Sequence, residues 1–255
     1  MKKTFLENDK PFLCAMIHFP TPEECIERIK AAIAGGADAI CVQLSKLKKE
    51  YRTKEIITEI FNACGDLPIY VTSYPQSESS DYTDEECTEL LLLGVDCGGT
   101  LFDVRGDLFD RGAKYELTTN PEAVEKQKKL IDEIHRRGGE VLISCHTGSA
   151  PTLEENLMIA HAQKERGADV IKIVNIAKDS SYVPVCIESI QKIIKETGKK
   201  LLFLGSEEAQ VIRFIGANFG VCMYLCYENE NILNVKQPLS LKHMKTIREN
   251  LYFKV

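Results

Sequence analysis

Short apolar runs recur along the chain, and each is followed by a stretch with helical periodicity. The runs lie at residues 12 to 18, 38 to 44, 67 to 73, 95 to 102, 140 to 146, 169 to 175, 200 to 205 and 220 to 226. They show little polar alternation, which is typical of strands buried on both faces of a parallel sheet. The pattern therefore predicts eight parallel strands.

The segments between these runs carry the start and stop signals of helices. TPEECIERIKAAIAGG and NPEAVEKQKKLIDEIHRRGG begin with polar capping residues and end with glycine. Thr152 and Glu155 form a capping-box pattern ahead of another helix. The joins GGAD, LGVD and RGAD each place a glycine at a predicted helix end and an aspartate before the next strand. Helices therefore alternate with the strands.

Eight strand–helix units in a chain of this length predict an α/β fold, a (β/α)8 TIM barrel. A doubly wound open sheet is the alternative, but the even spacing of the units and the lack of a Gly-rich phosphate loop favour the barrel. No linker or shift in composition divides the chain, so we expect a single barrel domain over residues 1–255. Active sites of such barrels lie at the C-terminal ends of the strands. The longest irregular stretches follow predicted strands three, four and eight, at this end.

Composition narrows the partners and the compartment. A net charge of -6 and a pI near 5.5 argue against binding to nucleic acid or to anionic membranes. No signal peptide and no apolar stretch of membrane-spanning length is recognisable in the sequence. The ten cysteines are scattered and form no CxxC pair, which argues against a disulfide framework and a zinc site. We therefore expect a cytoplasmic protein with reduced cysteines.

One charged residue interrupts a run that otherwise reads as a fully buried strand. Lys172 lies within ADVIKIVNIAKD, among valines and isoleucines. Burial lowers the pKa of a lysine and makes a neutral, nucleophilic amine available near neutral pH. The alternative is a lysine near a strand end whose ammonium reaches solvent. His146 ends the preceding strand, and neighbouring strands bring such side chains close together. This pairing favours proton transfer beside a Schiff base.

These residues carry a resemblance to a known family. The stretch from EVLISCH through TLEENLMIAHAQKERGADVIKIVNIAKD resembles type I 3-dehydroquinate dehydratase, whose ISxH and GADIVKI strands supply a histidine and a Schiff-base lysine. The likeness extends from KPFLCAMI through LSLKHMKTI. The resemblance implies a lyase in which Lys172 forms an imine with a cyclic hydroxy-ketone. His146 would then transfer protons while water leaves, and Arg213, in VIRFIGANFG, would grip the substrate.

The same resemblance implies a homodimer that acts on a small-molecule keto substrate. No metal or dissociable cofactor is implied, because a lysine imine is itself an electron sink. The protein would therefore need only its own side chains for the reaction.

Several positions depart from the family's substrate-recognition pattern. Aligned by eye, Cys41, Gln43 and Ser45 replace the family's glutamate, arginine and aspartate of strand two. Tyr74 replaces the arginine of strand three, and Thr100 replaces the glutamate of strand four. Pro238 lies in the segment that replaces the family's C-terminal SAPGQ contact. The strand-four glutamate orients the catalytic histidine in the family. Asp103, Asp107 and Asp110 follow in this chain as candidate substitutes, with solvated surface acids as the alternative reading.

Three functional hypotheses follow from this pattern. The first is a dehydroquinase-like lyase acting on dehydroquinate or a related cyclic hydroxy-ketone. The second is a Schiff-base lyase or aldolase for a different carbonyl substrate, because the lost recognition residues affect specificity more than chemistry. The third is a non-catalytic barrel that binds a metabolite or a partner protein.

Overall fold

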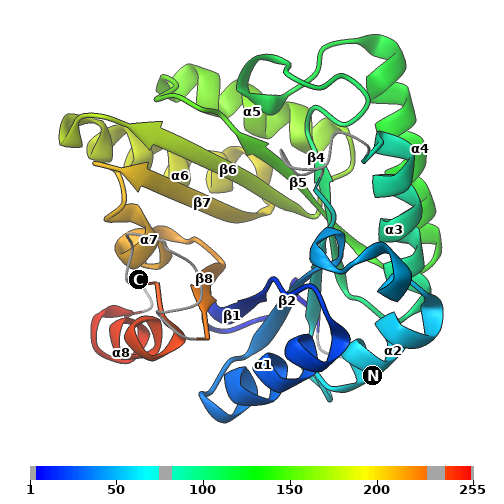
Figure 1. Cartoon of the computed structure of the whole chain (residues 1–255). Coiled ribbons are helices and arrows are strands. Elements are labelled where there is room, and N and C mark those ends of the chain that lie inside the picture. Colours follow the sequence, from blue (N-terminus) through cyan, green and yellow to red (C-terminus); the bar gives the residue numbers. More distant parts are fainter. Residues whose placement is uncertain (1–3, 75–81, 229–238, 254–255) are drawn as a thin grey trace. The chain divides into compact units, whose positions relative to one another are not determined.

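The computed structural model describes residues 4–74, 82–228 and 239–253 (Figure 1). Within these residues strands and helices alternate along the chain. The strands are β1 (Phe12–Ile17), β2 (Ala39–Gln43), β3 (Ile69–Thr72), β4 (Leu101–Arg105), β5 (Glu140–His146), β6 (Val170–Ala177), β7 (Lys200–Glu207) and β8 (Met223–Tyr227). The helices are α1 (Pro22–Ala34), α2 (Lys54–Asn62), α3 (Asp84–Asp96), α4 (Pro121–Arg136), α5 (Leu153–Glu165), α6 (Val183–Thr197), α7 (Ile212–Ile215) and α8 (Leu241–Leu251).

The order of the strands is that of a (β/α)8 barrel. They pair in the order β7-β6-β5-β4-β3-β2-β1-β8, so each strand neighbours the next and β8 returns to β1. A parallel bridge between Leu201 and Val221 also ties β7 to the segment that leads into β8. The predicted fold class is therefore confirmed. The doubly wound alternative is wrong, because its strand order reverses partway along the sheet.

The helix caps follow the sequence signals. Thr152 and Glu155 form both hydrogen bonds of the capping box at the start of α5. In the GGAD join, Gly36 adopts a φ of 92° just after α1, and in the RGAD join Gly167 adopts a φ of 105° just after α5. A residue without a Cβ atom reaches these left-handed conformations without steric cost. The chain is therefore turned into the following strand where the sequence indicates.

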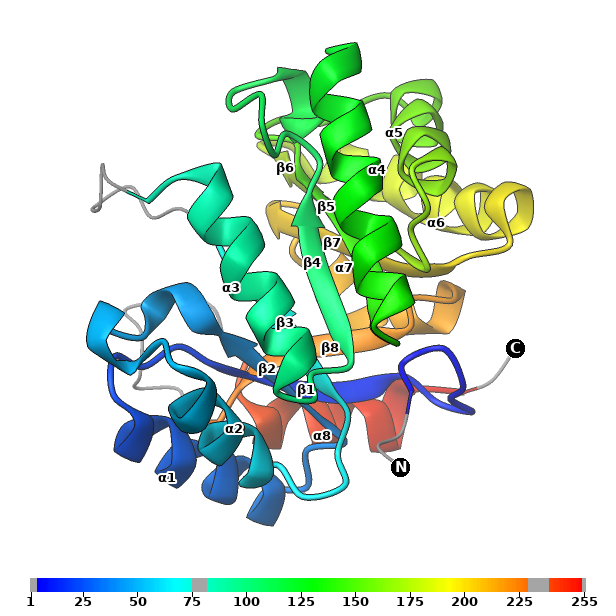
Figure 2. The ribbon, with the colours of Figure 1, turned by 90° about the vertical axis from the view of Figure 1, so that its right-hand side faces the viewer.

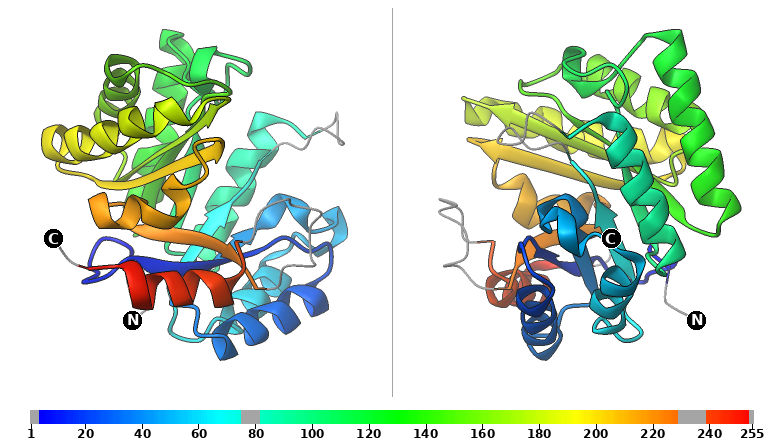
Figure 3. Two further views of the ribbon diagram at one scale, coloured as in Figure 1. Left: turned by 90° about the vertical axis from the view of Figure 1, so that its left-hand side faces the viewer. Right: turned by 45° about the vertical axis from the view of Figure 1, so that its right-hand side comes forward.

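By its internal contacts the chain divides into two compact units. The first unit comprises Met1–Asp103, Arg136–Glu140 and Leu225–Asn250. Within it α1 packs on β1 and against α2 (Figure 3). The second unit comprises Val104–His135, Val141–Tyr224 and Leu251–Val255. The prediction of a single domain over residues 1–255 stays a prediction.

In the second unit the two faces of the sheet have different roles. Helix α5 packs on β6, α6 packs on β7, and the two helices pack against each other (Figure 2). The amide of Gln163 on α5 donates to the Sγ atom of Cys145, so the odd-numbered residues of β5 face the helices. Side chains alternate along a strand. His146 therefore lies on the opposite face, and the sheet register places Lys172 there too.

The fourth strand differs from its predicted position. The apolar run at 95 to 102 was expected to form it, but helix α3 continues to Asp96 and β4 begins only at Leu101. Gly94, expected to end the helix in the LGVD join, is buried inside α3. Val95 instead packs as part of the last helical turn, and Gly98, with a φ of 90°, turns the chain toward β4. The C-terminal end of β4 is therefore Arg105.

Three further properties bear on the predicted setting. Among residues 4–74, 82–228 and 239–253, no helix is long and apolar enough to cross a membrane. All ten cysteines are buried thiols. The described part of the chain has no cluster of three or more His, Cys, Asp or Glu side chains arranged to hold a metal ion.

Candidate active site

Lys172 is the third residue of β6 and is almost completely buried. Its exposed fraction is 4%, so the alternative of an ammonium that reaches solvent does not hold. Gln163 of α5 holds its backbone from both sides: the amide nitrogen donates to Lys172 O at 3.0 Å, and Lys172 N–H donates to the amide oxygen at 3.0 Å. In the sheet its neighbours are Ser144 on β5 and Leu202 on β7. The position of this lysine is therefore fixed by both the sheet and the helix behind it.

His146 ends β5, on the strand beside Lys172. The register pairs Ser144 with Lys172 and His146 with Val174, so the imidazole and the lysine lie on the same face, one pleat apart. The His146 side chain is 43% exposed, whereas Lys172 is buried. The structure thus brings the two predicted residues to one face of adjacent strands, with the histidine nearer the C-terminal ends of the strands.

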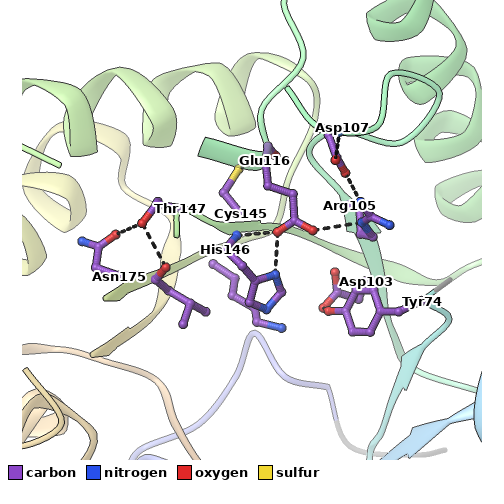
Figure 4. A network of polar contacts seen from close by, with 12 residues as sticks. Tyr74, Asp103, Arg105, Asp107, Glu116, Cys145, His146, Thr147 and Asn175 are labelled. Carbon is purple, nitrogen blue, oxygen red and sulfur yellow. Dashed lines mark hydrogen bonds and ion pairs between the residues drawn. The ribbon is translucent and has the colours of Figure 1, made fainter. Parts of the chain in front are cut away.

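The His146 ring is held by a carboxylate from the loop after β4. Nδ1 lies 2.5 Å from Oε2 of Glu116, and the same oxygen accepts the backbone N–H of His146 at 2.5 Å (Figure 4). The other oxygen, Oε1, accepts from Nε of Arg105 at 3.0 Å. Arg105 also donates to Asp107 at 2.5 Å, and Asp107 accepts the backbone N–H of Gly112 at 3.0 Å. The result is a chain of alternating charges, Glu116, Arg105 and Asp107, that ends on the imidazole.

Electrostatics favour the ionised form of Glu116. Burial raises the pKa of this carboxyl, but the hydrogen bonds from His146 and the charge of Arg105 outweigh burial, so its pKa is lowered from the ordinary value. An ionised carboxylate only accepts hydrogen bonds, so Nδ1 of His146 must carry the proton in this contact. When the ring is deprotonated once, Nε2 is the nitrogen that can accept a proton. The arrangement therefore orients a general base.

A buried arginine fixes the loop that carries Glu116. Arg166, after α5, donates to Gly106 O at 3.0 Å, to Thr118 O at 2.5 Å and to the side-chain oxygen of Gln127 at 2.8 Å. Gln127 donates in turn to Gly106 O at 3.1 Å. The two ends of the loop, at Gly106 and Thr118, are also joined by a backbone hydrogen bond of 2.9 Å. The loop is therefore anchored at its base.

Arg213 lies in the short helix α7 at the C-terminal end of β7. Its Nε donates to Gly205 O at 2.7 Å, and an Nη atom donates to the hydroxyl of Ser206 at 3.2 Å. Strand β7 pairs directly with β6, which carries Lys172. The guanidinium is thus fixed at the C-terminal end of the neighbouring strand. Its predicted role in substrate binding stays a prediction.

Comparisons with known proteins agree with this arrangement. The profile of the type I 3-dehydroquinase family matches residues 13–202, which is most of the chain and runs from β1 to the start of β7. The chain belongs to the type I 3-dehydroquinase family. Members of this family are dehydratases, a class of lyases, so the predicted family and enzyme class are confirmed. A search of curated protein sequences gives no match.

Solved structures of type I dehydroquinases show the same fold. The enzyme from Clostridium difficile has a TM-score of 0.80 at 18% identity, over 95% of this chain and 92% of that one. The 3-dehydroquinate dehydratase from Enterococcus faecalis has a TM-score of 0.78 at 18% identity, over 96% of each chain. The enzyme from Geobacillus kaustophilus has a TM-score of 0.76 at 15% identity, over 95% and 91%. At these identities the likeness establishes the fold.

In the first unit, the side chains that depart from the dehydroquinase pattern bond to one another. Gln43 donates to the hydroxyl of Ser45 at 3.2 Å, and the same hydroxyl accepts the backbone N–H of Tyr74 at 3.1 Å. Cys41 is buried beside Tyr70 in the sheet register. The hydroxyls of Tyr70 and Tyr74 both donate to one oxygen of Asp103. Figure 4 shows Tyr74 beside Asp103. These strand ends therefore carry an internal polar network.

The proposed equivalence between Thr100 and the dehydroquinase strand-four glutamate is wrong. Thr100 precedes β4, and its hydroxyl accepts the N–H of Ile69 at 3.1 Å, at the strand end opposite to His146. The error follows from placing the strand too early in the sequence. Pro238 lies outside the described residues.

Sequence reasoning missed the residue that orients the histidine. The three aspartates considered for this role have other partners: Asp103 binds the two tyrosines, Asp107 binds Arg105, and Asp110 accepts from Thr118. Glu116 takes the role because Tyr115 and Glu116 both have positive φ, 61° and 54°. Non-glycine residues rarely adopt this conformation, so residue spacing does not predict it. The remaining signal in the sequence is that Glu116 lies in the long loop after β4, at the C-terminal ends of the strands.

Proposed function

We propose that this dehydroquinase-family chain dehydrates a cyclic hydroxy-ketone through an imine on Lys172, with His146 as the acid–base residue. The observation that carries the proposal is the contact between His146 and Glu116. It leaves Nε2 basic on the face that also holds the buried lysine. The supported substrate is 3-dehydroquinate or a close relative, as the family implies.

The side chains of this chain, with the substrate and water, account for every bond and proton in the reaction. The amine of Lys172 adds to the ketone carbon, and water leaves to give a protonated imine. His146 removes a proton from the adjacent carbon, and the electron pair moves toward the imine nitrogen to form an enamine. The electrons then return and expel the hydroxyl on the next carbon, which His146 protonates so that it departs as water. Hydrolysis of the unsaturated imine releases the enone and restores the amine.

Arg213 supports this proposal as a substrate clamp. Its guanidinium is already oriented by Gly205 and Ser206, so less rotamer freedom is lost when it meets an anion. A guanidinium fork suits a carboxylate or a vicinal pair of hydroxyls. We also propose a homodimer, as in the resemblance, and a cytoplasmic setting, which suits the ten buried thiols.

The test is the release of the conjugated enone from dehydroquinate, followed by its ultraviolet absorbance. The wild-type chain should form the product, and Lys172→Ala should abolish it. Lys178→Met is the matched control, because Lys178 follows the same strand but is exposed. Full activity of Lys172→Ala would reject the mechanism.

The internal network at the replaced positions favours a second candidate. Since Ser45 and Tyr74 already bond within the protein, this region differs from the dehydroquinase recognition pattern. A Schiff-base lyase or aldolase for a different carbonyl substrate would keep Lys172 and His146 and change these contacts. An imine with dehydroquinate that never yields enone supports this candidate. If no ketone forms an adduct, the third hypothesis is supported, namely a non-catalytic barrel that binds a metabolite or a partner protein.

A further inference from the structure

The turn that carries Glu116 is held in an unfavourable backbone conformation. Tyr115 and Glu116, in the short turn Lys114–Glu116, are consecutive non-glycine residues with φ of 61° and 54°. A left-handed conformation costs free energy for such residues and persists only where surrounding contacts enforce it. The contacts that hold this turn therefore decide where the Glu116 carboxylate lies.

Glu155 of α5 provides an anchor on the N-terminal side of Glu116. The hydroxyl of Tyr115 donates to Oε1 of Glu155 at 2.5 Å. Glu155 is itself fixed, because Oε2 accepts the backbone N–H of Thr152 at 2.9 Å in the capping box. The phenol is thus tied to the first turn of α5, a helix that begins seven positions after His146, the last residue of β5.

A second anchor lies on the other side of the turn. The Sγ atom of Cys145 donates to Glu116 O at 3.2 Å, and Thr118 N–H donates to Gly106 O at 2.9 Å. These bonds fix the carbonyl of Glu116 and the chain that follows it. On the N-terminal side of Glu116, the hydrogen bond of the Tyr115 hydroxyl restrains the turn.

We propose that Tyr115 is a positioning residue, whose hydrogen bond to Glu155 keeps the Glu116 carboxylate on Nδ1 of His146. Without this bond the turn relaxes toward negative φ, and the carboxylate withdraws from the ring. The imidazole then samples both tautomers, and the basic Nε2 form is no longer enforced. The helix cap of α5 and the orientation of the base are thereby coupled. Only the catalytic consequence rests on the proposed function.

The direct test is nitrogen NMR on histidine-labelled protein without substrate. The resonance of His146 is assigned by its loss in His146→Asn. In the wild type we expect a single tautomer with its proton on Nδ1, and in Tyr115→Phe a shift toward mixed tautomers. Lys178→Met is the control, because this exposed lysine lies outside the turn Lys114–Glu116. An unchanged His146 resonance in Tyr115→Phe would overturn the inference.

A kinetic measurement adds the consequence for turnover. Tyr115→Phe should lower kcat by about tenfold, in the range of outer-shell orienting contacts, with KM unchanged within about twofold. A merely structural role would lower the amount of folded enzyme and leave the His146 tautomer unchanged. A changed tautomer with an unchanged dehydration rate would overturn the proposed role of His146 and support the Tyr115 contact itself.

Discussion

Glu116 lies with its Oε2 atom 2.5 Å from Nδ1 of His146, although the two residues are thirty positions apart and the carboxylate comes from a loop. Arg105, at the end of β4, binds the other oxygen of the same carboxylate at 3.0 Å. The ring is therefore oriented by a charged group that is itself held by a second charge. This arrangement gives the predicted base a defined tautomer.

Replacing the orienting carboxylate tests this role. Glu116→Gln keeps the shape of the side chain but removes its charge, so the Nδ1 proton is held less firmly and the imidazolium formed during turnover loses its partner. We expect kcat with dehydroquinate to fall by about 10- to 100-fold with little change in KM. Steady-state kinetics measure it, with the exposed Glu122→Gln as the control. A variant that turns over at the wild-type rate would exclude the role.

The lowered pKa of Glu116 also predicts a pH-dependent stability. Because the folded state favours the ionised form, the contribution is fully present above the unfolded value of about 4.5 and is lost as pH falls through the folded pKa. Glu116→Gln should therefore be less stable than the wild type by about 1–3 kcal/mol at pH 7. Urea unfolding from pH 7 to pH 3.5 should show this difference shrinking below about pH 4.5. A difference that is constant across the series would contradict the assignment.

Gly106 tests how closely the loop must approach β5. A Cβ atom there would lie 2.4 Å from Glu116 O and 2.7 Å from the Sγ atom of Cys145, which no real contact tolerates. Gly106→Ala should therefore displace the Glu116 turn, lower kcat, and destabilise the fold by about 1–3 kcal/mol.

Gly138→Ala is the comparison for Gly106→Ala. Its added Cβ meets no atom within 4 Å, although its φ is 84°. This variant should lose stability through backbone strain alone and keep its kcat. Thermal unfolding and kinetics on both variants separate the two effects. Equal kcat values for the two variants would show that the close approach at Gly106 does not position the turn.

Arg166 tests the anchoring at the base of the loop. Its guanidinium is buried and donates to two backbone carbonyls and to Gln127. Arg166→Met keeps much of the apolar stem and leaves these acceptors without their charged donor, so it should cost about 2–4 kcal/mol in the free energy of unfolding. Chemical denaturation measures it. A loss below about 0.5 kcal/mol, as at ordinary surface positions, would show that the network is not anchored there.

The sequence predicted the part of the site that lies on regular strands. Lys172 and His146 fall within apolar runs whose ends are marked by helix caps, so the pattern predicts both of their strands. Their shared face follows from the sheet register of the structure. The fourth strand was misplaced, because Val95 and Cys97 extend the apolar pattern through the end of α3 before β4 begins. The expected strand therefore stopped short of Arg105.

The orienting carboxylate could not be found by the same reasoning. Its place depends on two positive φ angles at Tyr115 and Glu116, and on the distant Arg166 that holds the loop ends together. Neither is encoded in spacing or hydrophobic periodicity. The identity of the residue was available from the sequence, while its direction came only from the folded loop.

The most direct test of the central claim is reductive trapping of the imine. The protein is incubated with dehydroquinate and borohydride, digested, and examined by mass spectrometry, with Lys178→Met and Lys172→Ala treated in parallel. We expect an adduct on the peptide that contains Lys172, at the same level in Lys178→Met and absent from Lys172→Ala. An adduct level that is unchanged in Lys172→Ala, or no adduct while enone is still released, would rule out an imine on Lys172.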